Sequence, residues 1–140
     1  MSTNFSAIEF MEFGNSKRGE RAGFFLTASI SKREKFVNYR TGISHDITQI
    51  IIEKGLNWMR VGLNKYTGQI CVVFCKDYEI GALPIGFESS RSSARIYNKE
   101  LAFYWKKLLG ITSEKFCERI ETSADISRTD NYATFVIQTK

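Results

Sequence analysis

Basic side chains are concentrated just before the two segments in which we expect helices to begin. Residues 16–40 carry seven Lys or Arg side chains and only two acidic ones. Lysine and arginine bind phosphate and displace counterions from nucleic acid, and such contacts position a protein on the backbone. We expect this chemistry from seven residues: Lys32, Arg33, Lys35, Arg40, Arg91, Arg95 and Lys99. The alternative interpretation is that these charges lie in solvated loops.

Residue types that support catalysis or metal binding are sparse. His45 is the only histidine, and its place in the first turn of a predicted helix indicates an exposed side chain rather than a base. Cys71 would need a base such as His45 to act as a nucleophile, and nothing local supplies one. The three cysteines lack the spacing of zinc ligands. We therefore expect no catalytic residue, no metal, no cofactor, and a protein that is not an enzyme.

Composition indicates a folded protein of the cytoplasm. The 140 residues are 43% hydrophobic and 25% charged, which suits one ordinary domain or two very small units that share a core. The net charge of +5 permits binding to polyanions, although solubility alone also explains it. On a strand Cys71 and Cys75 would lie about 13 Å apart, too far for a disulfide. No apolar run reaches the length of a membrane span, and residues 1–10 show no secretory signal.

Two helices follow from capping residues and helical spacing. Residues 98–110 begin with Asn98, place leucines and Trp105 on one face, and end at Gly110. Residues 44–55 begin with Ser44 and end at Gly55, although the run of three isoleucines at 50–52 also suits a strand. We favour a helix there because a cap precedes the run and a glycine closes it.

Strands are predicted where β-branched and aromatic residues lie between turn residues. The expected strands are residues 24–31, 36–39, 58–63, 69–74, 94–97, 116–123 and 133–138. Residues 64–68 form a hairpin turn in which Gly68 is available for a positive φ. A further short edge strand at residues 8–13 and a basic turn at 14–21 complete the prediction.

The same order of elements occurs twice. Ser44 precedes Asn98 by 54 residues, and Gly55 precedes Gly110 by 55. We expect an N-terminal arm (1–23), a first β-α-β-β unit (24–80), a linker around Pro84 (81–92) and a second β-α-β-β unit (93–140). A diverged duplication explains this order, and the alternative is two similar units without common descent.

A family resemblance is carried by residues 95–102 and 108–112. There a short strand, a capped helix and a Leu-Gly-Ile ending resemble the AbrB type of swapped-hairpin DNA-binding domain. Two such units in one chain are similar to the MraZ family of cell-division-linked transcriptional regulators, whose paired Asp-x-x-x-Arg signature is replaced here by residues 32–35 and 90–93. The resemblance implies a closed pseudo-dimeric barrel, binding to double-stranded DNA, and a homo-oligomer.

We therefore predict an α+β protein with mostly antiparallel strands that binds DNA without catalysis and regulates transcription. The alternative is a structural or assembly protein, for example a virion component of a phage or mobile element. It rests on the 11 Phe, 6 Tyr and 2 Trp, which would then anchor protein–protein contacts. Packing of those aromatics in the core is the competing explanation.

Overall fold

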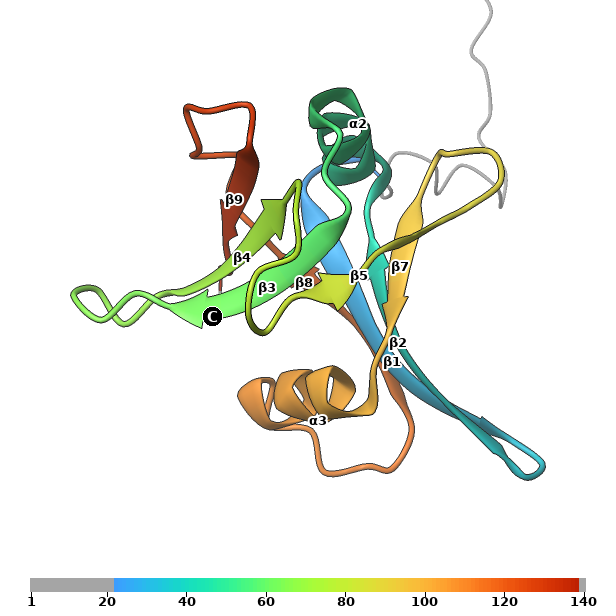
Figure 1. The fold of residues 1–140 in the computed structure, drawn as a ribbon. Helices are drawn as coiled ribbons and strands as arrows, with labels where there is room; N and C mark the ends of the chain where they lie inside the picture. The colour runs from blue at the N-terminus through green and yellow to red at the C-terminus, as the bar shows by residue number, and fades with distance from the viewer. Residues whose placement is uncertain (1–21, 139–140) are drawn as a thin grey trace, which may run out of the picture.

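A computed structural model describes residues 22–138 as an α+β fold with two antiparallel sheets and two helices (Figure 1). The predicted strand at 8–13, the basic turn at 14–21, and all but the last two residues of the predicted arm lie outside the described residues. The elements are β1 (Phe25–Arg33), β2 (Phe36–Ile43), α2 (His45–Lys54), β3 (Trp58–Leu63), β4 (Ile70–Cys75), β5 (Leu83–Pro84), β6 (Gly86–Phe87), β7 (Ala94–Tyr97), α3 (Lys99–Leu108), β8 (Phe116–Glu121) and β9 (Tyr132–Val136).

The five-stranded sheet has the order β6-β7-β2-β1-β8. Along β1 apolar and polar residues alternate, and Leu26, Ala28 and Ile30 are buried. Because successive side chains of a strand point to opposite faces, one face of this sheet covers the core and the other faces away from it. Helix α3 packs on the core side, against β1 and β2.

The four-stranded sheet has the order β5-β3-β4-β9, and the expected closed barrel is wrong for the described residues. β8 pairs with β1, and just after the ends of β8 and β9 a single bridge joins Thr122 to Ile137. At the other side, β5 and β6 follow each other in the chain but belong to different sheets. Pro84 is the last residue of β5 and has no N–H to donate; the next N–H, that of Ile85, donates to the Asn57 carbonyl at 3.0 Å.

Both helices begin and end as the sequence predicts. The Ser44 hydroxyl accepts a hydrogen bond from the Ile47 N–H at 3.4 Å, and the Asn98 side chain accepts one from the Leu101 N–H at 2.9 Å. Gly55 adopts the left-handed conformation at φ 71° and closes α2. The cap and this glycine resolve the isoleucine run at 50–52 as helix rather than strand.

Several strand limits differ from the prediction. β1 continues to Arg33, and β2 continues from Phe36 to Ile43 rather than ending at Tyr39. The reason is that the two strands pair residue by residue from Leu26↔Ile43 to Arg33↔Phe36, which leaves only two residues for the turn. At the C-terminal end, β8 stops at Glu121 and β9 at Val136.

The core lies between the two sheets and the helices. Phe74 and Phe135 are fully buried with ring centroids 5.7 Å apart in an edge-on arrangement. Trp105 of α3 is also fully buried, and its indole N–H donates a hydrogen bond of 3.0 Å to the hydroxyl of Thr41 on β2. This bond joins α3 to the middle of the five-stranded sheet.

Replacing Trp105 by Phe should lower the free energy of unfolding by about 2–3 kcal/mol, because it leaves the buried Thr41 hydroxyl without its donor and opens a small cavity. Urea unfolding measures the change. Trp58→Phe is the matched control: Trp58 is half-buried and touches Tyr78 at its edge, so we expect a loss below about 1 kcal/mol. Equal losses in both variants would contradict the special role of the buried indole.

Candidate nucleic-acid interface

The ends of β1 and β2 form a two-stranded ribbon that projects from the molecule (Figure 1). β8 accompanies β1 only as far as Ile30, and β7 accompanies β2 only as far as Arg40. The strand residues between these two points pair only with each other, so the ribbon, residues 31–39, has both edges open. Its sharp turn puts Glu34 at a positive φ of 55°.

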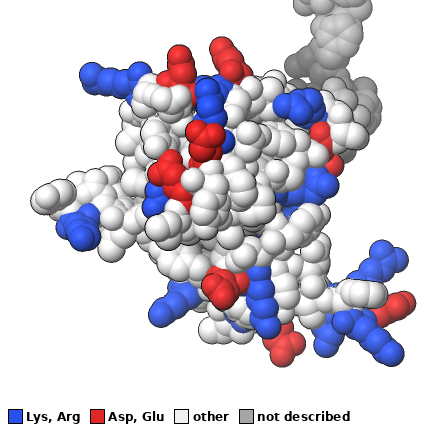
Figure 2. All heavy atoms as spheres, in the orientation of Figure 1, with Lys and Arg blue, Asp and Glu red and all other residues white. Residues whose placement is uncertain are grey.

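Three of the predicted cations lie on this ribbon. Lys32, Arg33 and Lys35 surround the turn, and none of them forms an ion pair with another residue in the described part of the chain. Figure 2 shows Lys and Arg side chains gathered at the tip, at lower right, away from the bulk of the protein. Phe36, in the same turn region, is 78% exposed. The tip therefore presents exposed positive charge beside an exposed aromatic ring.

Two more predicted residues lie side by side on the sheet. Arg40 of β2 is paired with Tyr97 of β7, and Arg95 is paired with Gly42. A Cβ on Gly42 would lie 2.8 Å from an Arg40 guanidinium nitrogen, so the glycine leaves room for that side chain to lie along the strand. Because residues 40 and 42 of β2 share a face with their partners on β7, both arginines point away from the core.

Arg95 is held in place by its surroundings. Its guanidinium forms an ion pair of 2.6 Å with Glu88, from the loop before β7, and lies 5.7 Å from the ring centre of Tyr97. Arg40 forms no ion pair with any described residue. Of the two arginines, Arg40 therefore carries the charge available to a ligand.

The remaining predicted residues are placed elsewhere. Lys99 opens α3, on the core side of the sheet, with its ammonium 5.8 Å from the Tyr39 ring. Arg91 lies in the loop between β6 and β7, above the ring of Phe87 at 5.2 Å. This loop is beyond the Ile43 end of β2, roughly 23 Å along the strand from the ribbon turn. The structure therefore does not place the two predicted groups symmetrically on one surface.

A hollow of about 310 Å³ lies between the base of the ribbon and α3. Lys32 lines it from the ribbon, Lys106 from α3, and Lys115 from the segment before β8, while Tyr39 and Phe103 supply rings. Glu114 is the single acidic side chain among the lining residues. The positive charge of the ribbon thus continues into this hollow.

Sequence reasoning missed the exposed rings of Phe36 and Tyr97. The signal that reveals them is period-two alternation: Thr27 and Ser29 are polar between buried apolar neighbours. This pattern defines one outward face for the whole sheet once the register is known. Strand propensity alone does not distinguish these two rings from aromatic rings in the core, because it does not say which face of the sheet a residue is on.

The described residues offer no activated nucleophile. His45 is exposed, and its Nδ1 lies 2.8 Å from the Ser92 carbonyl oxygen. Burial and then the nearby Glu79 carboxylate raise the pKa of the Cys75 thiol, which favours the unreactive protonated form. Within residues 22–138 no cluster of three or more His, Cys, Asp or Glu side chains is arranged to hold a metal ion. Neither helix there is long and apolar enough to cross a bilayer.

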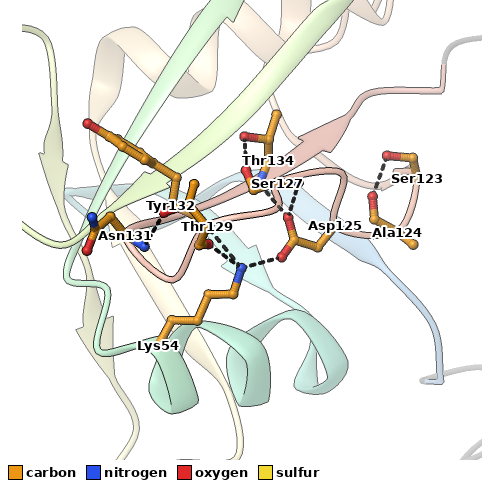
Figure 3. Close-up of polar contacts among 9 residues, drawn as sticks. All are labelled: Lys54, Ser123, Ala124, Asp125, Ser127, Thr129, Asn131, Tyr132 and Thr134. Atoms are coloured by element: carbon orange, nitrogen blue, oxygen red, sulfur yellow. Dashed lines mark hydrogen bonds and ion pairs between the residues drawn. The ribbon is translucent and has the colours of Figure 1, made fainter.

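Lys54 and Asp125 form the centre of a cluster of polar contacts (Figure 3). The Lys54 ammonium, at the end of α2, donates to Asp125 at 2.8 Å and to the carbonyls of Thr129 and Tyr132. The other carboxylate oxygen of Asp125 accepts from the N–H groups of Ser127 and Thr134. These bonds fasten the loop between β8 and β9 to α2. The Lys54 ammonium makes three hydrogen bonds and both carboxylate oxygens of Asp125 accept from protein groups, so we assign the cluster a structural role.

Comparison of the chain with protein-family models, curated proteins and solved structures finds no match.

The Asp125 cluster makes stability depend on pH. Burial on its own raises the pKa of Asp125, but the hydrogen bond from Lys54 and those from the two backbone N–H groups outweigh it, and the pKa lies below its ordinary value. A carboxyl whose pKa is lowered by folding stabilises the protein above its unfolded-state pKa. That contribution disappears as the pH falls through the folded-state pKa.

Asp125→Asn should therefore lower the free energy of unfolding by about 1–3 kcal/mol near pH 7, because Lys54 loses its anionic partner. The difference from the wild type should shrink at about pH 3, where Asp125 itself is becoming protonated. Thermal unfolding at both pH values measures this. Asp130→Asn is the control, because Asp130 is exposed in the same loop and has no ion pair among the described residues. A pH-independent difference would contradict the assignment.

Proposed function

We propose that this protein is a non-enzymatic DNA-binding protein and that it acts in transcription regulation. The observation that carries the proposal is the projecting ribbon with Lys32, Arg33 and Lys35 at its turn. Double-stranded DNA is the proposed partner. A two-stranded β-ribbon fits the major groove, which is about 12 Å wide, and several DNA-binding proteins use strands in this way.

Charge and geometry support contacts to the phosphate backbone. The three cations are exposed, and no described acidic residue is paired with them, so each can contact a phosphate without first breaking an ion pair. Arg40, farther along the ribbon's base, extends the positive charge onto the sheet. Contacts of this kind position a protein on DNA without reading its sequence.

We also propose that the two β-α-β-β segments are diverged copies related to the swapped-hairpin families. The segment from β2 to β4 and the segment from β7 to β9 have the same element order. Two strands of one segment pair with their counterparts in the other, β2 with β7 and β4 with β9, both antiparallel, whereas β3 and β8 lie in different sheets. Such pairing suits an internal two-fold relation, and a homo-oligomer of the chain would present more than one ribbon to DNA.

Fluorescence anisotropy with a labelled mixed-sequence duplex tests DNA binding. We expect affinity that falls at least about tenfold between 50 and 200 mM salt, because counterions are released on binding. The triple variant Lys32→Ala, Arg33→Ala, Lys35→Ala should lose most of this affinity. The triple variant Lys65→Ala, Lys76→Ala, Lys107→Ala removes the same charge from exposed positions away from the ribbon and should retain it. Equal losses in the two variants would show that net charge alone, and not the ribbon, attracts DNA.

A second candidate function, an assembly protein, is favoured by exposed apolar residues on the opposite side of the fold. Leu63 and Tyr66 stand at the β3–β4 turn, and Tyr78 and Ile80 in the loop after β4; they are between 61% and 99% exposed. Large exposed apolar side chains of this kind serve as anchors in protein interfaces.

Sedimentation velocity tests this candidate. If the exposed residues drive assembly, the wild type should self-associate at high salt, and Tyr66→Ser with Ile80→Ser should return it to a smaller species. Tyr104→Ser on α3, where Tyr104 is 40% exposed, is the control and should leave the association unchanged. A wild type that keeps the same small size at every salt concentration would remove the support for assembly.

A further inference from the structure

The side of the five-stranded sheet that faces away from the core and α3, here called the outer face, is rich in arginine and aromatic side chains. Strand alternation and register assign its members. They are Phe25, Thr27, Ser29, Ser31 and Arg33 of β1; Phe36, Asn38, Arg40 and Gly42 of β2; Arg95 and Tyr97 of β7; and Cys117, Arg119 and Glu121 of β8.

The register arranges these side chains in rows across the strands. One row places Tyr97, Arg40, Ser29 and Cys117 side by side on β7, β2, β1 and β8. The neighbouring row places Arg95, Gly42, Thr27 and Arg119 in the same order. Adjacent strands are about 4.8 Å apart, so each row is about 14 Å wide. Arg95 and Arg119 therefore stand at the two ends of the second row.

The charge of the outer face is positive. It carries four arginines and one glutamate, and that glutamate is paired with Arg119. Arg119 also lies over the Phe25 ring and donates to the Ala22 carbonyl, so it is fixed within the protein. Arg33 and Arg40, in contrast, form no ion pair with any described residue. A polyanion is the ligand that matches this distribution of charge.

Two aromatic rings are exposed beside these arginines. Tyr97 is 57% exposed and is the cross-strand partner of Arg40, while Phe36 is 78% exposed and is the partner of Arg33. The surface between them is polar, with Asn38 and the hydroxyls of Ser29 and Ser31. An apolar protein partner would leave those polar groups without hydrogen bonds, so the chemistry of the face does not suit one.

Building on the proposed nucleic-acid binding, we propose that the outer face binds an extended single strand of nucleic acid. Tyr97 and Phe36 stack with unpaired bases, and Arg40 and Arg33, which form no ion pair with a described residue, contact the phosphates. A ring stacks on a base only when the flat face of that base is accessible, as it is in a single strand and not inside a duplex. Stacking makes little distinction among bases, so we expect weak sequence preference.

Anisotropy with labelled oligo(dT) of about 12 nucleotides tests the proposal, since one sheet-based site takes roughly 4–16 nucleotides. We expect Tyr97→Ala to weaken oligo(dT) binding by about tenfold or more, because stacking on a ring contributes strongly to each base contact. Tyr97→Phe keeps the ring and should bind like the wild type. Tyr66→Ala removes a tyrosine that is even more exposed, in the β3–β4 turn, and should have no effect.

The reactivity of Cys117 shows whether the bound oligonucleotide covers the outer face. Cys117 is exposed and lies in the same row as Arg40 and Tyr97, whereas Cys71 is half-buried in the other sheet. Saturating oligo(dT) should slow alkylation of Cys117 by maleimide severalfold and leave the rate at Cys71 unchanged, as peptide mass spectrometry would record. The triple variant Lys65→Ala, Lys76→Ala, Lys107→Ala keeps every residue of the outer face, so Cys117 should still be protected in it.

The outcomes separate this inference from the proposed function. Duplex binding that depends on the ribbon, without oligo(dT) binding, would overturn the single-strand proposal and leave duplex binding intact. Oligo(dT) binding that neither protects Cys117 nor responds to Tyr97→Ala would place the site elsewhere and would also overturn it. If the folded wild-type protein binds neither the duplex nor oligo(dT), both proposals are overturned.

Discussion

The fold depends on the pairing of β1 along both of its edges. β2 occupies one edge from Leu26 to Arg33, and β8 occupies the other from Phe25 to Ile30. Leu26, Ala28 and Ile30 can be buried only because both neighbours are present and close the face above the core. The same pairing shapes both proposed binding surfaces: the ribbon begins where β8 and β7 end, and the outer face is four strands wide where they continue.

Local signals in the sequence predicted local structure well. Ser44 and Asn98 were recognisable as caps because a short polar side chain stood directly before an apolar helical pattern. The β3–β4 hairpin followed from turn residues ending in Gly68, which takes a positive φ of 75°. Which strands pair with each other was harder to predict from the sequence. Nothing local to β8 distinguishes pairing with β9, the next strand in the chain, from pairing with β1, so the predicted barrel was wrong.

Only the part of the candidate interface that depends on residues close in sequence could be predicted. Lys32, Arg33 and Lys35 lie within four positions of each other, so any hairpin there brings them together. Arg40 and Arg95 become neighbours only through the pairing of β2 with β7. Arg91 and Lys99 flank the same short strand in the sequence, yet the loop and the helix carry them to different parts of the molecule. The exposed rings of Phe36 and Tyr97 depend on register, which composition does not contain.

The pairing of β1 with β8 also has a consequence for how the chain acquires its structure. These strands come from opposite ends of the described residues, and their ladder closes most of the intervening chain into one loop. A protein dominated by such non-local contacts folds slowly, because much chain entropy is lost before the contact forms. During synthesis one edge of β1 stays open until β8 has emerged, and an open edge invites pairing with other strands. Release of the C-terminal segment therefore sets the earliest moment at which the five-stranded sheet is complete.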